Sequence, residues 1–374
     1  MKYRILGKTG YEVSSISMGC WGIGGQWGPI EEAQAIRTIE AAIEVGVNLF
    51  DTADSYGLGQ SEFYTGKALQ NKRDKVLIAT KVGNWGRRVG DPVGLKTIHS
   101  IINCCHASLY RLGTDYIDLY QCHVGTPENP EIFVEAFELL KQQGKIRHYA
   151  ISTNDLEALK AINVAGNCAA CQIDYSVLSR SAEKDILPYC LEKNIGVLLR
   201  GPIAQGLLAD KFSPETRFTD SVRLKWNPDG DQRAKFLGEL EKVKQLRELV
   251  TPEQNMLDLA LQFVLANPAV TCPIPGMKSP EQARLNVVAS DCDLDAETLR
   301  RIDEIFTPKA CCKPSLAPLT QDLIPSISAH WGDTFQPEFF IRIWSQLLPE
   351  EKGGNQTDQD QSNYPQGSEK ITQV

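Results

Sequence analysis

Short apolar segments alternate with longer amphipathic segments along most of this chain, and this alternation strongly limits the folds it can adopt. Eight segments rich in apolar and β-branched residues are expected to form strands: 14–19, 47–53, 75–81, 116–123, 146–152, 169–175, 196–200 and 270–276. Helical periodicity is clearest at 31–45, 96–111, 130–143, 180–193, 253–266 and 279–289. Because strands that alternate with helices form parallel sheets, eight such units favour a closed α/β barrel, the (β/α)8 or TIM barrel, over an open sheet.

The alternation ends near residue 308, so we expect a barrel over residues 1–308 and a C-terminal extension after it. A long excursion between Gly201 and Thr251 contains a charged helix at about 231–249. Residues 309–349 are expected to carry one helix, at 337–348, which either docks on the barrel or serves as a lid or partner-binding helix. Residues 350–374 are rich in Gln, Asn, Ser, Gly and Asp and are expected to be a disordered tail.

The charge and composition of the chain limit the classes of molecule that it is expected to bind. The chain has 374 residues, 42% of them hydrophobic, and a net charge of −8 without a long run of Lys or Arg, which argues against nucleic acid or a membrane surface as the main partner. The chain has no apolar stretch long enough to span a membrane, and Gly7 interrupts its first segment before the apolar core of a signal peptide could form. We therefore expect a cytoplasmic protein. Its partner is expected to be a small-molecule substrate. The 11 cysteines lack metal-ligand spacing, so no metal site is expected.

Four polar residues lie at the ends of three neighbouring predicted strands. Asp51 ends the apolar part of the segment 47–53, and Tyr56 follows in the next loop. Lys81 and His123 end the next two strands. Barrel enzymes carry their reactive groups at the carboxyl ends of the strands, because the loops after the strands converge on that face. Each residue alone has an ordinary structural explanation, but the four together indicate an active site.

These residue types suit proton transfer. A phenol has a reference pKa near 10, and a nearby ammonium group such as Lys81 favours the phenolate, which predicts that the pKa of Tyr56 is lowered. Asp51 would keep Lys81 charged, and His123 could hydrogen-bond a carbonyl oxygen and orient it toward Tyr56. The set therefore predicts a general acid that works beside a hydride donor.

Eight sequence blocks strengthen this interpretation. They are, in chain order, YRILGKTGYEVSSISMGCWGIGG, NLFDTADSYGLGQSE, ATKVG, DLYQCH, GKIRHYAIS, CQIDYSVLSR, GPIAQGLL and IPGMKSPEQARLN. Over about residues 3–306 they resemble the consecutive signatures of the aldo-keto reductase superfamily. The resemblance implies a (β/α)8 barrel, an NADPH or NADH cofactor, and reversible reduction of aldehydes and ketones to alcohols. It also places the family's catalytic tetrad on Asp51, Tyr56, Lys81 and His123, with Tyr56 as the proton donor.

The resemblance also implies contacts to the nicotinamide half of the cofactor. Gln172 and Ser152 match residues that bind the carboxamide, but Thr153 stands where the family has an asparagine, and Asn154 follows one place later. Arg200 replaces the aromatic residue that usually stacks on the nicotinamide, and a guanidinium can also lie flat on a ring. The cofactor-binding residues that follow it in register are Gly201, Pro202, Ile203 and Ala204.

The last block resembles the adenosine-binding segment of the family. Gly276 would open its loop, Lys278 would contact a 2′-phosphate, and Gln282 and Asn286 would face the adenine. Lys278 favours NADPH, and NADH is further disfavoured because Leu285 is apolar at a position that is often acidic in members that hold a free ribose hydroxyl. For the substrate mouth, the candidates are Trp21 and Trp85.

The sequence leaves alternatives open. A dinucleotide-binding G-x-G-x-x-G motif is excluded at Gly22 because position 27 is Trp27. The main hypothesis is an NADPH-dependent reductase of aldehydes or ketones. The same site would serve a dehydrogenase that oxidises a sugar or polyol. A nucleotide-sensing regulatory subunit, such as the potassium-channel β subunits of the superfamily, is the third interpretation; His123 argues against it, whereas the extension at 309–374 leaves a protein partner open.

Overall fold

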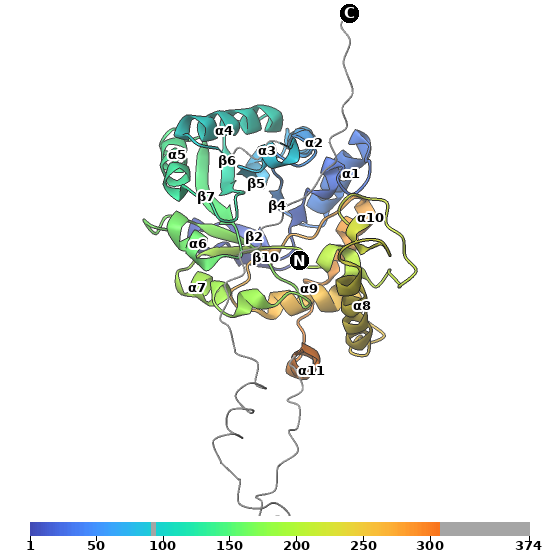
Figure 1. Ribbon diagram of the computed structural model, residues 1–374. Coiled ribbons are helices and arrows are strands. Elements are labelled where there is room, and N and C mark those ends of the chain that lie inside the picture. Colours follow the sequence, from blue (N-terminus) through green and yellow to red (C-terminus); the bar gives the residue numbers. More distant parts are fainter. Residues whose placement is uncertain (91–94, 307–374) are drawn as a thin grey trace, which may run out of the picture. The chain divides into compact units, whose positions relative to one another are not determined.

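The computed structural model describes residues 1–90 and 95–306 of the chain. At its centre lies an eight-stranded parallel sheet in which each strand pairs with its neighbours in chain order (Figure 1). The strands are β3 (Met18–Gly19), β4 (Leu49–Asp51), β5 (Leu77–Val82), β6 (Ile117–Cys122), β7 (Ile146–Ser152), β8 (Ala170–Asp174), β9 (Gly196–Arg200) and β10 (Cys272–Pro273).

The first and last strands of this sheet meet and close it. Gly19 pairs with Gly276 in a parallel bridge, and the amide of Gly19 donates a hydrogen bond of 3.1 Å to the carbonyl of Pro275. The amide of Ser17 donates another, of 3.0 Å, to the carbonyl of Pro273. The predicted (β/α)8 barrel is therefore confirmed, although β3 and β10 have only two residues each.

Each barrel strand is followed by a helix, and Figure 1 shows these helices around the strands. They are α1 (Glu32–Glu44), α2 (Gln60–Leu69), α4 (Ile98–Leu112), α5 (Pro130–Gln142), α6 (Leu156–Ile162), α7 (Ile186–Glu192), α9 (Met256–Ala266) and α10 (Pro280–Val288). Helices were expected after all eight strands, but helical periodicity indicated no ranges for α2 and α6. The helix predicted at 180–193 is two elements, a 3-10 turn η4 (Ser181–Glu183) and α7, because the side chain of Asp185 caps a new helix by accepting a 2.6 Å hydrogen bond from the amide of Ile186.

An N-terminal hairpin, which the sequence analysis also missed, precedes the barrel. Its strands are β1 (Tyr3–Ile5) and β2 (Glu12–Ser14), so the strand predicted at 14–19 is divided between β2 and β3. Within this hairpin, Val13 of β2 and Leu6, which follows β1, are buried in a cluster with apolar residues of the barrel strands. The hairpin therefore covers one end of the barrel, and the opposite end is free for a site.

The excursion after β9 has its own small core. It contains two 3-10 segments, η5 (Ala204–Ala209) and η6 (Leu224–Trp226), followed by α8 (Arg233–Arg247), which agrees with the predicted charged helix. Trp226 stacks on Phe236 with ring centroids 5.3 Å apart, and Phe218 packs edge-on against both rings. This packing gives the excursion a defined structure over the barrel.

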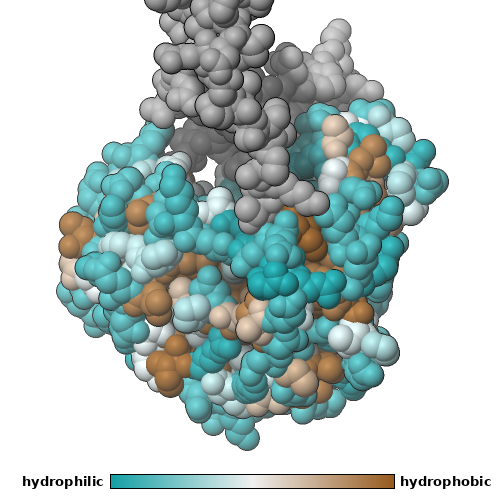
Figure 2. All heavy atoms as spheres, turned by 90° about the horizontal axis from the view of Figure 1, so that it is seen from below, coloured by the Kyte–Doolittle hydropathy of each residue, from teal (hydrophilic) through white to brown (hydrophobic). Residues whose placement is uncertain are grey.

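The remaining helices of the described part are α3 (Trp85–Arg88) and α11 (Ala296–Phe306), with short 3-10 segments η1 (Gly7–Thr9), η2 (Gly22–Gly24) and η3 (Arg73–Lys75). Among the described residues, no helix combines the length and the apolar character that crossing a bilayer requires. On the face drawn in Figure 2, hydrophilic residues predominate and apolar ones lie in small groups. The helix predicted at 337–348 and the tail predicted at 350–374 lie outside the described residues.

Candidate active site

The four polar residues predicted at strand ends lie together at the carboxyl end of the barrel. The ammonium nitrogen of Lys81, fully buried, lies 2.6 Å from Asp51 Oδ2 and 3.0 Å from the hydroxyl of Tyr56. The ring of His123 meets the ring of Tyr56 edge-on, with centroids 5.9 Å apart. β4 and β5 pair in parallel, so their ends bring the carboxylate and the ammonium group to the same level of the barrel. An unbroken polar chain therefore leads from Asp51 through Lys81 to the phenol.

A tight turn between β4 and α2 holds the phenol in place. Gly57, the residue after Tyr56, has φ +59°, a conformation that glycine adopts without steric cost. The backbone of Gly57 also lies against the loop at η2, where an added Cβ would come within 2.2 Å of the carbonyl oxygen of Gly24. The glycines of the GCWGIGG run thus allow close backbone packing beside Tyr56.

The electrostatics of Tyr56 correct one prediction. Burial raises the pKa of this phenol, and the attraction of Lys81, which acts in the opposite direction, does not offset the effect of burial. Asp51 adds to the upward shift because its negative charge disfavours a phenolate. The expected lowering of the pKa of Tyr56 is therefore wrong for the structure described. The phenol carries its proton at neutral pH, which is the form that a proton donor needs.

Lys81 remains charged despite its burial. Desolvation disfavours the ammonium form, but Asp51 and Tyr56 together raise the pKa of Lys81 above its ordinary value. The ammonium group donates a third hydrogen bond, of 2.7 Å, to the carbonyl of Thr52. All three of its hydrogens thus have an acceptor, which fixes its position beneath the phenol.

Two glutamines complete the surroundings of Asp51. Its Oδ1 accepts hydrogen bonds from the side-chain amides of Gln121 (2.9 Å) and Gln172 (2.8 Å). Gln172 also donates to Gln121 Oε1, at 3.3 Å. Because the side-chain nitrogen of Gln172 is used in this way, its side-chain oxygen Oε1, for which the described residues show no donor, can accept from a ligand. Sequence reasoning missed Gln121. The alternation of side chains along a strand could have indicated it, because Gln121 lies two places before His123 and therefore faces the same side of β6.

Three connected cavities open at this end of the barrel. The central cavity, about 390 Å³, is lined by residues that include Gly19, Trp21, Asp51, Tyr56, Gln172, Gly201, Pro202, Ile203, Gly276 and Lys278. It shares Ile203, Gly276 and Gln282 with a side cavity of about 380 Å³. It shares Trp21, Tyr56 and Arg200 with an outer cleft of about 820 Å³. Tyr56 therefore lies where the central cavity and the outer cleft meet.

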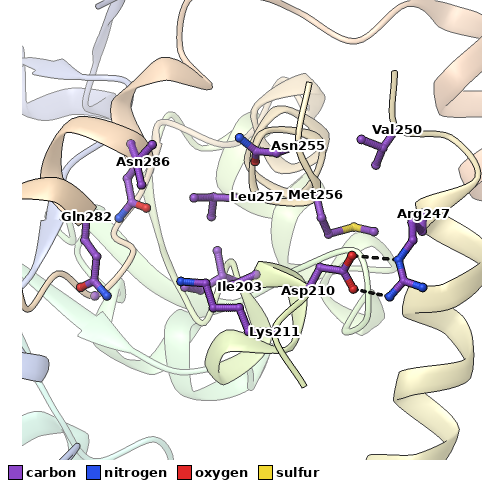
Figure 3. A pocket seen from close by; sticks show the side chains of 13 residues that line it. Ile203, Asp210, Lys211, Arg247, Val250, Asn255, Met256, Leu257, Gln282 and Asn286 are labelled. Carbon is purple, nitrogen blue, oxygen red and sulfur yellow. Dashed lines mark hydrogen bonds and ion pairs between the residues drawn. The ribbon is translucent and has the colours of Figure 1, made fainter. Parts of the chain in front are cut away.

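The side cavity is lined by three of the four residues predicted for the adenosine end, Gly276, Gln282 and Asn286. Gln282 and Asn286 of α10 lie across it from Arg247 of α8, which binds Asp210 through two hydrogen bonds of 2.8 and 2.5 Å (Figure 3). The side-chain nitrogen of Asn286 is buried and has no hydrogen-bond partner among the described residues. Lys211 also lines this cavity. The sequence analysis did not identify either cation, Lys211 or Arg247.

Lys278 is held by backbone carbonyls of a distant loop. Its ammonium nitrogen donates hydrogen bonds to the carbonyls of Trp27 (2.7 Å) and Gly28 (3.3 Å). It lines the central cavity together with Arg223, and it is absent from the lining of the side cavity. Burial and the neighbouring Arg223 lower the pKa of Lys278. The predicted contact between Lys278 and a 2′-phosphate is not tested by the described residues and stays a prediction.

The other predicted residues divide between the two larger cavities. Ser152 and Ala204 line the outer cleft, whereas Arg200 lines both cavities and forms an ion pair of 3.5 Å with Asp174. Ala204 and Gln205 both have positive φ, at 46° and 55°, which is costly for residues with a Cβ and typical of functional sites.

Of the two substrate candidates, Trp21 lies at the site and Trp85 does not. Trp21 lies near Tyr56 with ring centroids 6.1 Å apart. Trp85 lines none of the three cavities and instead contacts the guanidinium of Arg111, 5.5 Å from its ring. Its neighbour Asn84 lines the outer cleft in its place. Thr153, which replaces the family asparagine, donates a 2.6 Å hydrogen bond to the carbonyl of Gly125 and is absent from the cavity linings.

Comparisons with known proteins identify the family of this chain. The sequence model of the Aldo/keto reductase family matches residues 15–307. The chain is 36% identical over 293 residues to the uncharacterized oxidoreductase YqkF of Bacillus subtilis, covering 78% of this chain and 92% of that protein. It is 33% identical over 327 residues to the NADH-specific methylglyoxal reductase of Escherichia coli, covering 81% and 99%. A crystal structure of an aldo-keto reductase from Klebsiella pneumoniae in complex with NADPH is 28% identical, with a TM-score of 0.62 and coverage of 83% and 96%. The chain therefore belongs to the aldo-keto reductase family, whose members are NAD(P)H-dependent oxidoreductases.

Proposed function

We propose that this protein is an NADPH-dependent reductase that converts aldehydes or ketones to alcohols, with Tyr56 as the proton donor. One observation carries the proposal: the chain from Asp51 through Lys81 to Tyr56 ends at the junction of the central cavity and the outer cleft. A dinucleotide fits the central and side cavities, and a carbonyl compound can approach the same phenol from the outer cleft. The Klebsiella relative, which binds NADPH, supports this choice of cofactor.

The residues present suit such a cofactor. A Cβ added to Gly276 would meet no atom within 4 Å, so the space beside it is not needed for packing of the protein. The buried amide nitrogen of Asn286, which lacks a partner among the described residues, suits an acceptor on an adenine. Gln172 and Ser152 would hold the carboxamide end. The bound dinucleotide supplies the hydride that reaches the carbonyl carbon.

The protein's own groups handle the proton. The hydroxyl of Tyr56 donates its proton to the substrate's carbonyl oxygen, which becomes the alcohol hydroxyl. The ammonium group of Lys81, 3.0 Å away, stabilises the phenolate that remains, and Asp51 balances the charge of Lys81 between turnovers. His123, which also lines the outer cleft, orients the carbonyl oxygen toward Tyr56. Because the phenol is buried and protonated, the proton leaves only when a developing negative charge on the substrate oxygen attracts it.

The substitution Tyr56→Phe tests the assignment, since it removes the hydroxyl and keeps the ring. We expect kcat with NADPH and an aldehyde to fall about 10²- to 10⁴-fold, while the Kd for NADPH, measured by quenching of tryptophan fluorescence, changes less than about twofold. Tyr110→Phe is the matched control, because the Tyr110 side chain is 88% exposed on α4. Turnover retained by Tyr56→Phe would show that another group donates the proton.

Cofactor preference is testable at the two lysines. We infer that Lys211, in the side cavity beside Gln282 and Asn286, binds the 2′-phosphate of NADPH, and that Lys278 acts on parts common to both cofactors. Lys211→Gln should reduce the ratio of NADPH to NADH efficiency about tenfold or more, as loss of a charged hydrogen bond implies. Lys278→Gln should weaken both cofactors alike. Steady-state kinetics with each cofactor would measure these ratios. If the ratio fell only in Lys278→Gln, Lys278 and not Lys211 would bind the 2′-phosphate, as the sequence predicts.

A further inference from the structure

The outer cleft is lined by a group of charged residues that the proposed reaction does not require. These residues are Lys225 of η6 and Lys235, Glu239 and Lys242 of α8. We call these three lysines the lysine end. The inference below rests on the proposed function, because it concerns the substrate of the same site.

The lysine end has more positive than negative charge. Lys235 lies 3.9 Å from Glu239, and all three lysines act electrostatically on that single carboxyl group. Elsewhere in the cleft, Arg200 is matched by Asp174 at 3.5 Å. Among the described lining residues, the positive charge of the lysine end thus exceeds the negative charge that Glu239 provides. The excess is notable in a chain with a net charge of −8, where an average surface would be acidic.

This charge is separate from the cations that face the proposed cofactor. Lys211 and Arg247 line the side cavity, and Arg223 and Lys278 line the central cavity, whereas none of these four lines the outer cleft. The cofactor's phosphates therefore have other cations nearby. An anion at the lysine end would have to belong to the second ligand.

The rest of the outer cleft's lining is also partly polar. Ser176 and Ser179 line the cleft together with Gln232, beside the apolar residues Leu178 and Trp226. Hydroxyl and amide groups can hydrogen-bond an extended polar chain, which a purely apolar aldehyde would leave without partners. The cleft, at about 820 Å³, has room for a substrate much longer than its reacting carbonyl group.

We propose that the preferred substrate is an extended carbonyl compound with an anionic group, a carboxylate or a phosphate, which binds the lysine end while its carbonyl lies at Tyr56. Ion pairs formed there in a partly enclosed cleft add binding energy that neutral substrates do not gain. The site is therefore selective for the far end of the substrate as well as for its carbonyl group.

Paired substrates test this selectivity. Succinic semialdehyde is compared with butanal for the carboxylate, and erythrose 4-phosphate with erythrose for the phosphate. In each pair, kcat/KM of the wild-type enzyme should be about tenfold to hundredfold higher for the anionic member, and the preference should decrease as salt is added. The pair with the larger ratio identifies the anionic group. A wild-type ratio near one in both pairs would overturn the proposal.

The triple variant Lys225→Gln, Lys235→Gln and Lys242→Gln should lower the anionic-to-neutral ratio at least tenfold. Lys244→Gln is the matched control, since this exposed lysine lies on the same helix but not in the cleft lining, and it should leave the ratio unchanged. An unchanged ratio in the triple variant would overturn the proposal. So would a rise in the Kd for NADPH, which would assign the lysines to the cofactor.

A binding measurement separates this inference from the proposed function. Glutarate, a dianion without a carbonyl to reduce, should bind the NADPH-loaded wild-type protein in calorimetry, and its binding should be lost in the triple variant. If no aldehyde is turned over but glutarate binding still depends on the lysines, the reductase assignment fails and the anion site stands. If aldehydes are turned over and glutarate does not bind, the anion site fails alone.

Discussion

At the scale of single residues, the site depends on how Asp51 uses its two oxygens. Oδ2 accepts from Lys81, while Oδ1 accepts from both glutamines, so the carboxylate is held on both sides. Strand-end positions were enough to predict that Asp51 and Lys81 would meet. The sequence could not show that burial would outweigh the effect of Lys81 on Tyr56, because the balance depends on how much water reaches each group in the folded protein.

A second buried carboxyl group, that of Asp54, leads to a prediction about pH. Its side chain is 2% exposed, and its Oδ1 has no hydrogen-bond partner among the described residues. Burial, with the nearby Glu62, raises the pKa of Asp54 to about 7, although Arg111 and Lys81 act in the opposite direction. Between about pH 4 and pH 7 the folded chain keeps a proton that the unfolded chain has released, so Asp54 lowers the free energy of unfolding as the pH rises.

Replacing Asp54 by Asn removes this ionisation. We compare the free energy of unfolding of Asp54→Asn with that of the wild type at each pH. The variant's value minus the wild-type value should be about 2 to 3 kcal/mol larger at pH 8 than at pH 5. Urea unfolding at the two pH values measures the difference. Asp229→Asn, at an exposed position of the excursion, is the control and should show no such change. A constant difference between Asp54→Asn and the wild type would mean that Asp54 ionises as an exposed carboxyl does.

At the scale of elements, the parts that sequence patterns missed are short. The hairpin strands have three residues each, too few for alternation to be visible, and their burial depends on the barrel floor that they cover. The helix α2 begins directly after the turn that holds Tyr56, and Glu62 and Ser61 within it are buried polar residues, which disguise its periodicity. Tertiary contacts determine these elements more than local preference does.

The loop after β10 offers a test of the cofactor path. A Cβ at Gly276 would enter open space that borders the central and side cavities, and its backbone is not in the left-handed region. Gly276→Val should therefore leave the unfolding temperature within about 2 °C of the wild type, while the Kd for NADPH rises about tenfold or more because the side chain occupies the ligand's space. Fluorescence quenching and thermal unfolding measure the two effects.

A matched glycine controls for the general effect of adding a side chain. Gly238 on α8 also has no atom within 4 Å of an added Cβ, but it lies outside the central and side cavities. Gly238→Ala should bind NADPH as the wild type does and be slightly more stable, since alanine favours a helix. If Gly276→Val bound NADPH normally, the cofactor would have to follow a different path.

At the scale of the whole molecule, the sequence predicted the barrel, its family and the grouping of the reactive side chains. The barrel was predictable because eight repeated units leave few alternatives, and the strand-end rule then brought Asp51, Lys81 and His123 together. The positions of Lys278 and Trp85 were not predictable, because both depend on how loops from distant parts of the chain pack at the barrel mouth. Lys278 is held by carbonyls about 250 residues away in sequence.

Binding of the cofactor should stabilise the folded protein as a whole, because the proposed cofactor-binding residues come from distant parts of the chain. If NADPH binds only the closed barrel, a concentration of 100 times its Kd should raise the free energy of unfolding by about 2.7 kcal/mol and the unfolding temperature by a few degrees. Tyr56→Phe should keep this stabilisation because the phenol hydroxyl acts on the substrate, whereas Gly276→Val, with a Kd about tenfold higher or more, should lose about half of it or more at the same NADPH concentration. Thermal unfolding of the three proteins with and without NADPH provides the measurement. If NADPH stabilised all three proteins equally, the cofactor would not bind in the cavity beside Gly276. If the stabilisation were lost in Tyr56→Phe, the phenol hydroxyl would contribute to cofactor binding as well as to proton transfer.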